Sequence, residues 1–193
     1  KSCSVVGLEK NTGKTVTLNY LLQHLPPTHR VAVTSIGLDG ELKDQVTGTA
    51  KPEITLFKGM LFATSEKHYR QRRLQSEILE VSDESTALGR LVTARVLSEG
   101  KVLLSGLGST QGLKRWMNKI ESETDLILID GALSRMSLAS PTISESLILA
   151  TGAAYSANIE TLVRKTRHIV ALTRLPLYEG AMPADNIIEA QGA

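Results

Sequence analysis

Cysteine, aromatic residues and long apolar runs are all scarce in this chain of 193 residues. The one cysteine, Cys3, excludes an intrachain disulfide and any zinc site built from several thiolates. No apolar run approaches the roughly 20 residues that span a bilayer, and no signal-peptide pattern opens the sequence. We therefore expect a cytoplasmic protein that does not associate with membranes.

A large excess of charge of one sign is also missing. The chain has 22 Lys and Arg residues against 20 Asp and Glu residues, a net charge of +2, which does not predict a nucleic-acid-binding surface. The four histidines are scattered, so they predict no metal site. Hydrophobic residues make up 41% of the chain, which is typical of one folded domain with a substantial core.

Short apolar runs alternate with longer amphipathic segments along most of the sequence. Continuously apolar strands that alternate with helices predict an α/β fold, with a mostly parallel sheet covered by helices on both faces. Strands are expected at 4–6, 31–33, 102–104, 126–129 and 147–149, and helices at 14–25, 86–98, 111–122 and 157–173.

The stretch 44–82 breaks this alternation. It contains short strand-like runs and one charged helical segment, 66–73. We interpret it as a small irregular insertion within a single domain, residues 1–178; additional core topology is the alternative. Residues 179–193 are expected to form a poorly ordered tail.

The most informative segment is the loop that ends in Gly13-Lys14-Thr15, between an apolar strand and a helix. Such a loop holds phosphate through its backbone N–H groups, and the helix N-terminus adds partial positive charge. We expect Lys14 to bridge the β- and γ-phosphates and the Thr15 hydroxyl to bind Mg²⁺. A fortuitous Gly-Lys-Thr at a helix start is the alternative. The predicted nucleotide-binding residues are Gly7, Lys10, Asn11, Thr12, Gly13, Lys14, Thr15 and Val16.

Two aspartates follow apolar strands and are candidates for work at the γ-phosphate. Asp39 lies between two glycines after the second strand, and we expect it to bind Mg²⁺ through water or to position the attacking water. Asp130 directly follows the apolar run 126–129, the pattern of a Walker B aspartate. Simple turn or cap roles are the alternatives for both. The predicted catalytic residues are Lys14, Asp39 and Asp130, and the predicted metal ligands are Thr15, Asp39 and Asp130.

The six-residue spacing from Gly7 to Gly13 resembles the phosphate loop of dethiobiotin synthetase, within the P-loop class that includes MinD. In that class a second lysine often reaches across a dimer. Here Glu9 holds that position and Lys10 follows it, so a homodimer role and a solvated loop position both stay open for Lys10. Ser105 stands where the synthetase has a glutamate, and the synthetase's substrate lysine after the second strand is missing. These departures argue against the same small-molecule chemistry.

More narrowly, the chain resembles the small P-loop proteins encoded beside lysine 5,6-aminomutase and ornithine aminomutase and regarded as reactivases of those enzymes. The resemblance rests on residues 9–15, 34–41, 129–135 and 150–154. It implies ATP-driven exchange of damaged cobalamin, with a larger reactivase subunit or the aminomutase itself as partner. The absence of Asn-Lys-x-Asp favours ATP over GTP. A small-molecule kinase or ligase of the synthetase type, and a module that binds nucleotide without hydrolysis, are the alternatives.

Overall fold

A computed structural model of the chain describes residues 1–36, 53–86, 88–132 and 144–175. The α/β class is confirmed. The first elements are β1 (Ser2–Gly7), α1 (Lys14–His24), β2 (Val31–Ser35), β3 (Ile54–Leu56), β4 (Leu61–Ser65) and α3 (Glu66–Arg70). They are followed by β5 (Arg73–Thr86), β6 (Gly89–Val102), α4 (Thr110–Ile120), the 3₁₀ turn η1 (Glu121–Glu123), β7 (Leu126–Ala132), β8 (Ser146–Ala150) and α5 (Ile159–Thr173).

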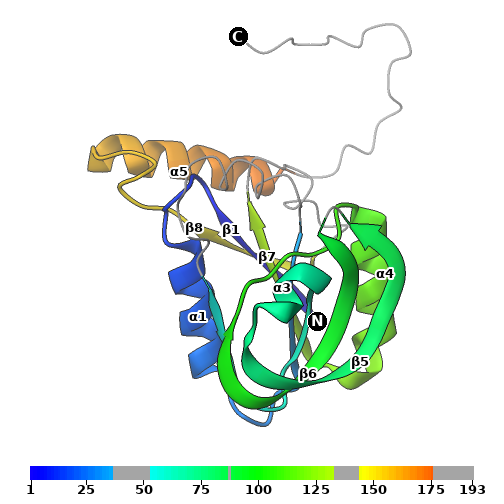
Figure 1. Cartoon of the computed structure of the whole chain (residues 1–193). Helices are drawn as coiled ribbons and strands as arrows, with labels where there is room; N and C mark the ends of the chain where they lie inside the picture. Colours follow the sequence, from blue (N-terminus) through cyan, green and yellow to red (C-terminus); the bar gives the residue numbers. More distant parts are fainter. Residues whose placement is uncertain (37–52, 87, 133–143, 176–193) are drawn as a thin grey trace, which may run out of the picture.

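The strands form one mixed sheet in the order β3-β6-β4-β2-β7-β1-β8, with β5 paired to β6 outside this path. The five neighbours β4, β2, β7, β1 and β8 are parallel to one another. Strand β6 runs antiparallel to β3, β4 and β5, and the long β5–β6 hairpin curls away from the parallel part (Figure 1). The parallel part brings the carboxyl ends of β4, β2, β7 and β1 to one edge.

The expected helix at 86–98 is wrong, because these residues belong mainly to strand β6. Val92 of β6 pairs with Thr64 of β4 on one side and with Val81 of β5 on the other. Over residues 91–94 both faces of the strand are buried, with Leu91 in one core cluster and Val92 in the other. Because apolar residues occur on both faces of the strand, their spacing in the sequence resembles that of an amphipathic helix. The strand expected at 102–104 is also wrong: Val102 is the last residue of this antiparallel strand.

The described part of the expected insertion belongs to the main sheet. Residues 54–56 form β3, and β4 pairs in parallel with β2, placing Leu61 beside Ala32. The segment therefore continues the core topology, which was the alternative interpretation. Its first residues, 44–52, and the expected tail at 179–193 lie outside the described residues.

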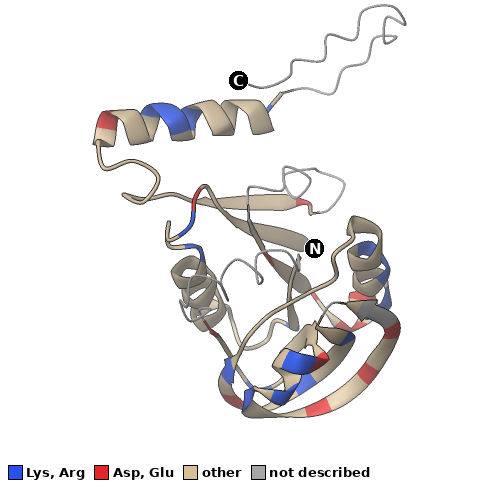
Figure 2. Cartoon of the chain, turned by 45° about the horizontal axis from the view of Figure 1, so that its top comes forward, with Lys and Arg blue, Asp and Glu red and all other residues tan. Residues whose placement is uncertain are grey.

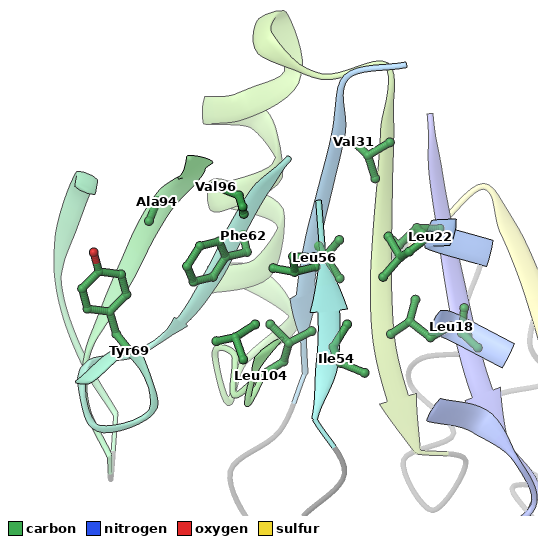
Figure 3. Packing of buried hydrophobic residues seen from close by; sticks show 14 of the residues in the cluster. Leu18, Leu22, Val31, Ile54, Leu56, Phe62, Tyr69, Ala94, Val96 and Leu104 are labelled. Atoms are coloured by element: carbon green, nitrogen blue, oxygen red, sulfur yellow. The ribbon is translucent and has the colours of Figure 1, made fainter. Parts of the chain in front are cut away.

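Two core clusters form because successive residues of the strands point to opposite faces of the sheet. Leu18 and Leu22 of α1 join the cluster that contains Phe62, Leu56 and Leu104 (Figure 3). The second cluster packs one side of α4 on the alternate strand residues; its members include Leu113, Trp116, Ile120, Ala32, Ile127 and Ile129. The sheet edge that carries the candidate site is thus held by a dense interior.

Candidate functional site

The loop that contains the phosphate-binding pattern connects β1 to α1 at the carboxyl end of β1. Strand β1 is buried along its whole length, with β7 and β8 as its parallel neighbours. The backbone N–H of Leu8 donates to the Ala150 carbonyl oxygen at 3.0 Å, so β8 holds the start of the loop. Inside the loop, the Thr12 hydroxyl donates to the Glu9 carbonyl oxygen at 2.8 Å. These bonds fix the loop against the sheet.

Two glycines allow the loop to be this compact. A Cβ at Gly7 would lie 2.8 Å from Thr12 Oγ1 and 3.2 Å from the Glu9 carbonyl oxygen, so any other residue there would force Thr12 or the loop backbone to shift. Gly13 has φ of 90° and Asn11 has φ of 62°, both left-handed. Left-handed residues within a tight loop produce the backbone concavities that bind anions.

The N-terminus of α1 is not capped by a side chain. Gly13 occupies the N-cap position, and the first turn contains no acidic residue. The nearby Thr17 hydroxyl donates to the Gly13 carbonyl oxygen at 3.1 Å. It therefore does not accept a hydrogen bond from the N–H groups of the first turn. Unpaired N–H groups and the helix dipole together favour an anion at this position.

Lys14 and Asp130 meet at the mouth of the loop. Lys14 Nζ lies 2.9 Å from Asp130 Oδ1, and the two side chains are 25% and 11% exposed. The register of β1 and β7 places Asp130 beside Val5, and the Ile36 N–H donates to the Asp130 carbonyl oxygen at 3.1 Å. Asp130 Oδ1 is buried and receives no hydrogen bond, because the Lys14 contact has ion-pair distance without hydrogen-bond geometry. A buried carboxylate oxygen that accepts no hydrogen bond is suited to bind a metal cation or a water molecule coordinated to one.

The remaining predicted residues divide by position. Thr15 is half-buried in the first turn of α1, whereas Lys10 and Asn11 are exposed in the loop. The Val16 side chain is 73% exposed, so only its backbone can serve the loop. Asp39 lies outside the described residues. The residues that the structure brings together are Gly7, Thr12, Gly13, Lys14 and Asp130.

The connection from β8 to α5 also lines the loop. A Cβ at Gly152 would lie 3.6 Å from the Thr12 carbonyl oxygen, an ordinary contact distance. The Tyr155 N–H donates to the Gly152 carbonyl oxygen at 2.8 Å and closes a turn there. The sequence signal was the run 150–154, although a run of small residues after a strand is equally typical of a plain turn.

A buried polar cluster occupies the carboxyl end of β4. Ser105 Oγ lies 2.6 Å from Ser65 Oγ, 2.7 Å from His68 Nδ1 and 3.2 Å from Thr64 Oγ1. All four residues are buried. The sequence did not predict the burial of His68, because its charged neighbours in 66–73 suggested a solvated helix. Ser105 is therefore part of an internal hydrogen-bond network.

Few groups in the described ranges could bind a metal directly. No three His, Cys, Asp or Glu side chains gather there in an arrangement that could hold an ion. Mg²⁺ is commonly bound by one or two protein ligands together with phosphate oxygens and water. Thr15 and Asp130 fit that requirement, since they flank the loop and Asp130 offers a buried oxygen without a hydrogen bond.

Comparisons with models of protein families, with curated proteins and with solved structures find no match to this chain. None of the helices in the described ranges has both the length and the apolar character needed to cross a membrane. Function is therefore inferred from the geometry of the loop and of Asp130.

Proposed function

We propose that the chain binds Mg-ATP at the loop 7–15 and hydrolyses it. The observation that carries this proposal is the Lys14–Asp130 contact beside an uncapped helix N-terminus. A cation, a buried carboxylate and free backbone N–H groups at one point are what a metal-bound triphosphate requires. The proposed architecture is that of a P-loop NTPase, in which the parallel part of the sheet is covered by helices on both faces.

Each residue has a separate task in this proposal. The backbone of 11–15 and the Lys14 ammonium hold the phosphates, and Asp130 keeps that ammonium at the loop before nucleotide arrives. Thr15 and Asp130 would hold Mg²⁺, with Asp39 as the further candidate from the sequence. When bound, Mg²⁺ neutralises charge on the phosphate oxygens. Asp39 would orient the attacking water, so Asp39→Asn should bind Mg-ATP and hydrolyse it slowly.

Within this activity, we favour a reactivating ATPase for an adenosylcobalamin-dependent aminomutase. The support is the set of motifs that resemble the reactivase subunits. The structure adds that Ser105, at the position of the synthetase glutamate, bonds inward to Ser65 and His68. A side chain engaged in that way is poorly suited to binding a second small substrate. Hydrolysis would instead change the chain's contact with a protein partner.

The test combines calorimetry with analysis of products. Mg-ATP is titrated into wild type, Lys14→Ala and Lys58→Ala, the last being a control for loss of an exposed lysine outside the loop 7–15. Wild type and Lys58→Ala should bind similarly, whereas Lys14→Ala should bind much more weakly. Single-turnover reactions should release free phosphate. Stoichiometric transfer of phosphate to a metabolite, without free phosphate, would instead establish a kinase.

A further inference from the structure

Helix α5 carries apolar side chains that are exposed or only partly buried. None of its residues is buried, and Ile159 and Val163 are 75% and 48% exposed. The helix lies beyond the β8 end of the sheet, on the opposite side of the molecule from the β5–β6 hairpin (Figure 1). This exposure distinguishes α5 from α1 and α4, which both bury apolar residues in the core.

The apolar residues of α5 form one continuous stripe. They recur at the spacing of a single helix face: Ile159 and Val163 are exposed, and Leu162, Ile169 and Val170 are partly buried. Two interactions link side chains of α5 to the segment before it. The hydroxyls of Thr151 and Thr166 lie 3.3 Å apart, and Lys165 Nζ lies 5.2 Å from the Tyr155 ring centre. A helix with such a stripe ordinarily buries it against another element.

Positive charge flanks this stripe. Glu160 is the one acidic residue of α5, near its start, whereas Lys165 and Arg167 lie on the two sides of the stripe in the middle of the helix (Figure 2). Two copies of α5 packed together would bring these like charges close. The stripe also lacks the Trp or Phe residues that are typical of helices lying in a lipid interface. The charge is complementary to an acidic protein surface.

We propose that α5 is a docking helix for a protein partner that presents an apolar groove rimmed by aspartate and glutamate. Helix-in-groove recognition uses anchors at this spacing, and rim charges fix orientation. The segment 151–158 joins α5 to the phosphate loop, because Ala150 bonds to Leu8 and Gly152 packs on Thr12. Docking is therefore coupled to nucleotide binding, and this coupling rests on the proposed function.

The experiment uses the full chain as bait in a lysate of its source cells, followed by identification, purification and titration of the captured protein. Val163→Asp should weaken its binding at least tenfold. Arg167→Glu should weaken it several-fold and reduce its dependence on salt. His168→Ala, on the face opposite the stripe, is the matched control and should bind like wild type. Neutralising the partner's groove carboxylates should reproduce the Arg167→Glu effect.

Several outcomes would overturn the proposal. One is a captured protein whose affinity does not change in Val163→Asp. Another is that the bait captures no protein. Val163-dependent sedimentation with phosphatidylserine vesicles, or a Val163-dependent dimer in the ultracentrifuge, would replace the partner by lipid or by a second copy. The coupling is tested by titrating the partner with and without Mg-ATP: equal affinities would overturn it.

ATP binding by each α5 variant is measured separately, so the two proposals can fail independently. The variants should bind Mg-ATP like wild type. A wild-type chain that fails to bind nucleotide would disprove the proposed function and its coupling, while the docking titrations would still stand.

Discussion

Lys14 Nζ lies 2.9 Å from Asp130 Oδ1, although Lys14 begins helix α1 and Asp130 belongs to strand β7. The contact holds the ammonium group at the mouth of the loop 7–15, where the proposed nucleotide would bind. A bound phosphate would compete with Asp130 for Lys14, while Mg²⁺ would take over the neutralisation of Asp130. The two residues should therefore respond differently to mutation.

Replacing Lys14 by alanine should weaken Mg-ATP binding by about 1.5–3 kcal/mol, the scale of hydrogen bonds to charged groups. This corresponds to roughly 10- to 150-fold in the dissociation constant. The fold should survive, because Lys14 is only half-buried and faces the loop. Calorimetry measures the affinity and circular dichroism checks the fold. Unchanged affinity would refute the role of Lys14.

Asp130→Asn should change the Mg²⁺ dependence of ATP binding. With saturating Mg²⁺ the variant should bind ATP about tenfold more weakly, because a carboxylate is lost from the metal's surroundings. Without Mg²⁺ it should bind at least as well as wild type, because Lys14 is freed and a negative charge is removed. Titration of ATP over a series of Mg²⁺ concentrations measures both limits. A parallel loss at every concentration would contradict a role in metal binding.

Gly13→Ala and Gly59→Ala form a matched pair. The two glycines have φ of 90° and 89°, and a Cβ at either position would meet nothing within 4 Å. Each substitution should therefore cost a similar strain of about 1–2 kcal/mol in the free energy of unfolding. Only Gly13→Ala should also weaken Mg-ATP binding, because Gly13 belongs to the phosphate loop. Thermal unfolding and calorimetry on both variants test this; an equal effect on ATP binding would contradict it.

The stability should fall in acid partly through Asp125. Hydrogen bonds from the Arg30 side chain and backbone, at 2.7 and 3.0 Å, lower the pKa of Asp125 from its ordinary 3.8 to about 2. Because the folded pKa is lower than the unfolded one, this contribution is complete above about pH 4 and is lost as the pH falls toward 2. Asp125→Asn should flatten the unfolding free energy in that window. Denaturant titrations at several pH values test this, with Asp83→Asn as the control.

Local signals in the sequence were sufficient to predict the loop before Lys14 and the strand and helix on either side of it. A strand, a glycine-rich turn and a helix from Lys14 to His24 depend on neighbouring residues, and the structure has all three. The apolar run before Asp130 likewise predicts a buried strand, which is β7. The general α/β class follows from the same alternation, because short apolar runs and amphipathic segments are local patterns.

Other features depended on residues that are distant in the sequence. Whether 89–102 is a helix or a strand was decided by β4 and β5, which pair with its two edges, and by the core clusters on its two faces, since its apolar spacing suits either structure. The hydrogen bond of buried His68 depends on Ser105, and the exposure of Ile159 and Val163 depends on where helix α5 lies. The contact of Lys14 with Asp130 exists because β1 and β7 pair in one register. The sequence by itself determined which residues could serve a phosphate site. The tertiary structure decided which of them meet, because strand pairing and helix packing bring together segments whose local sequences do not indicate that they will be neighbours.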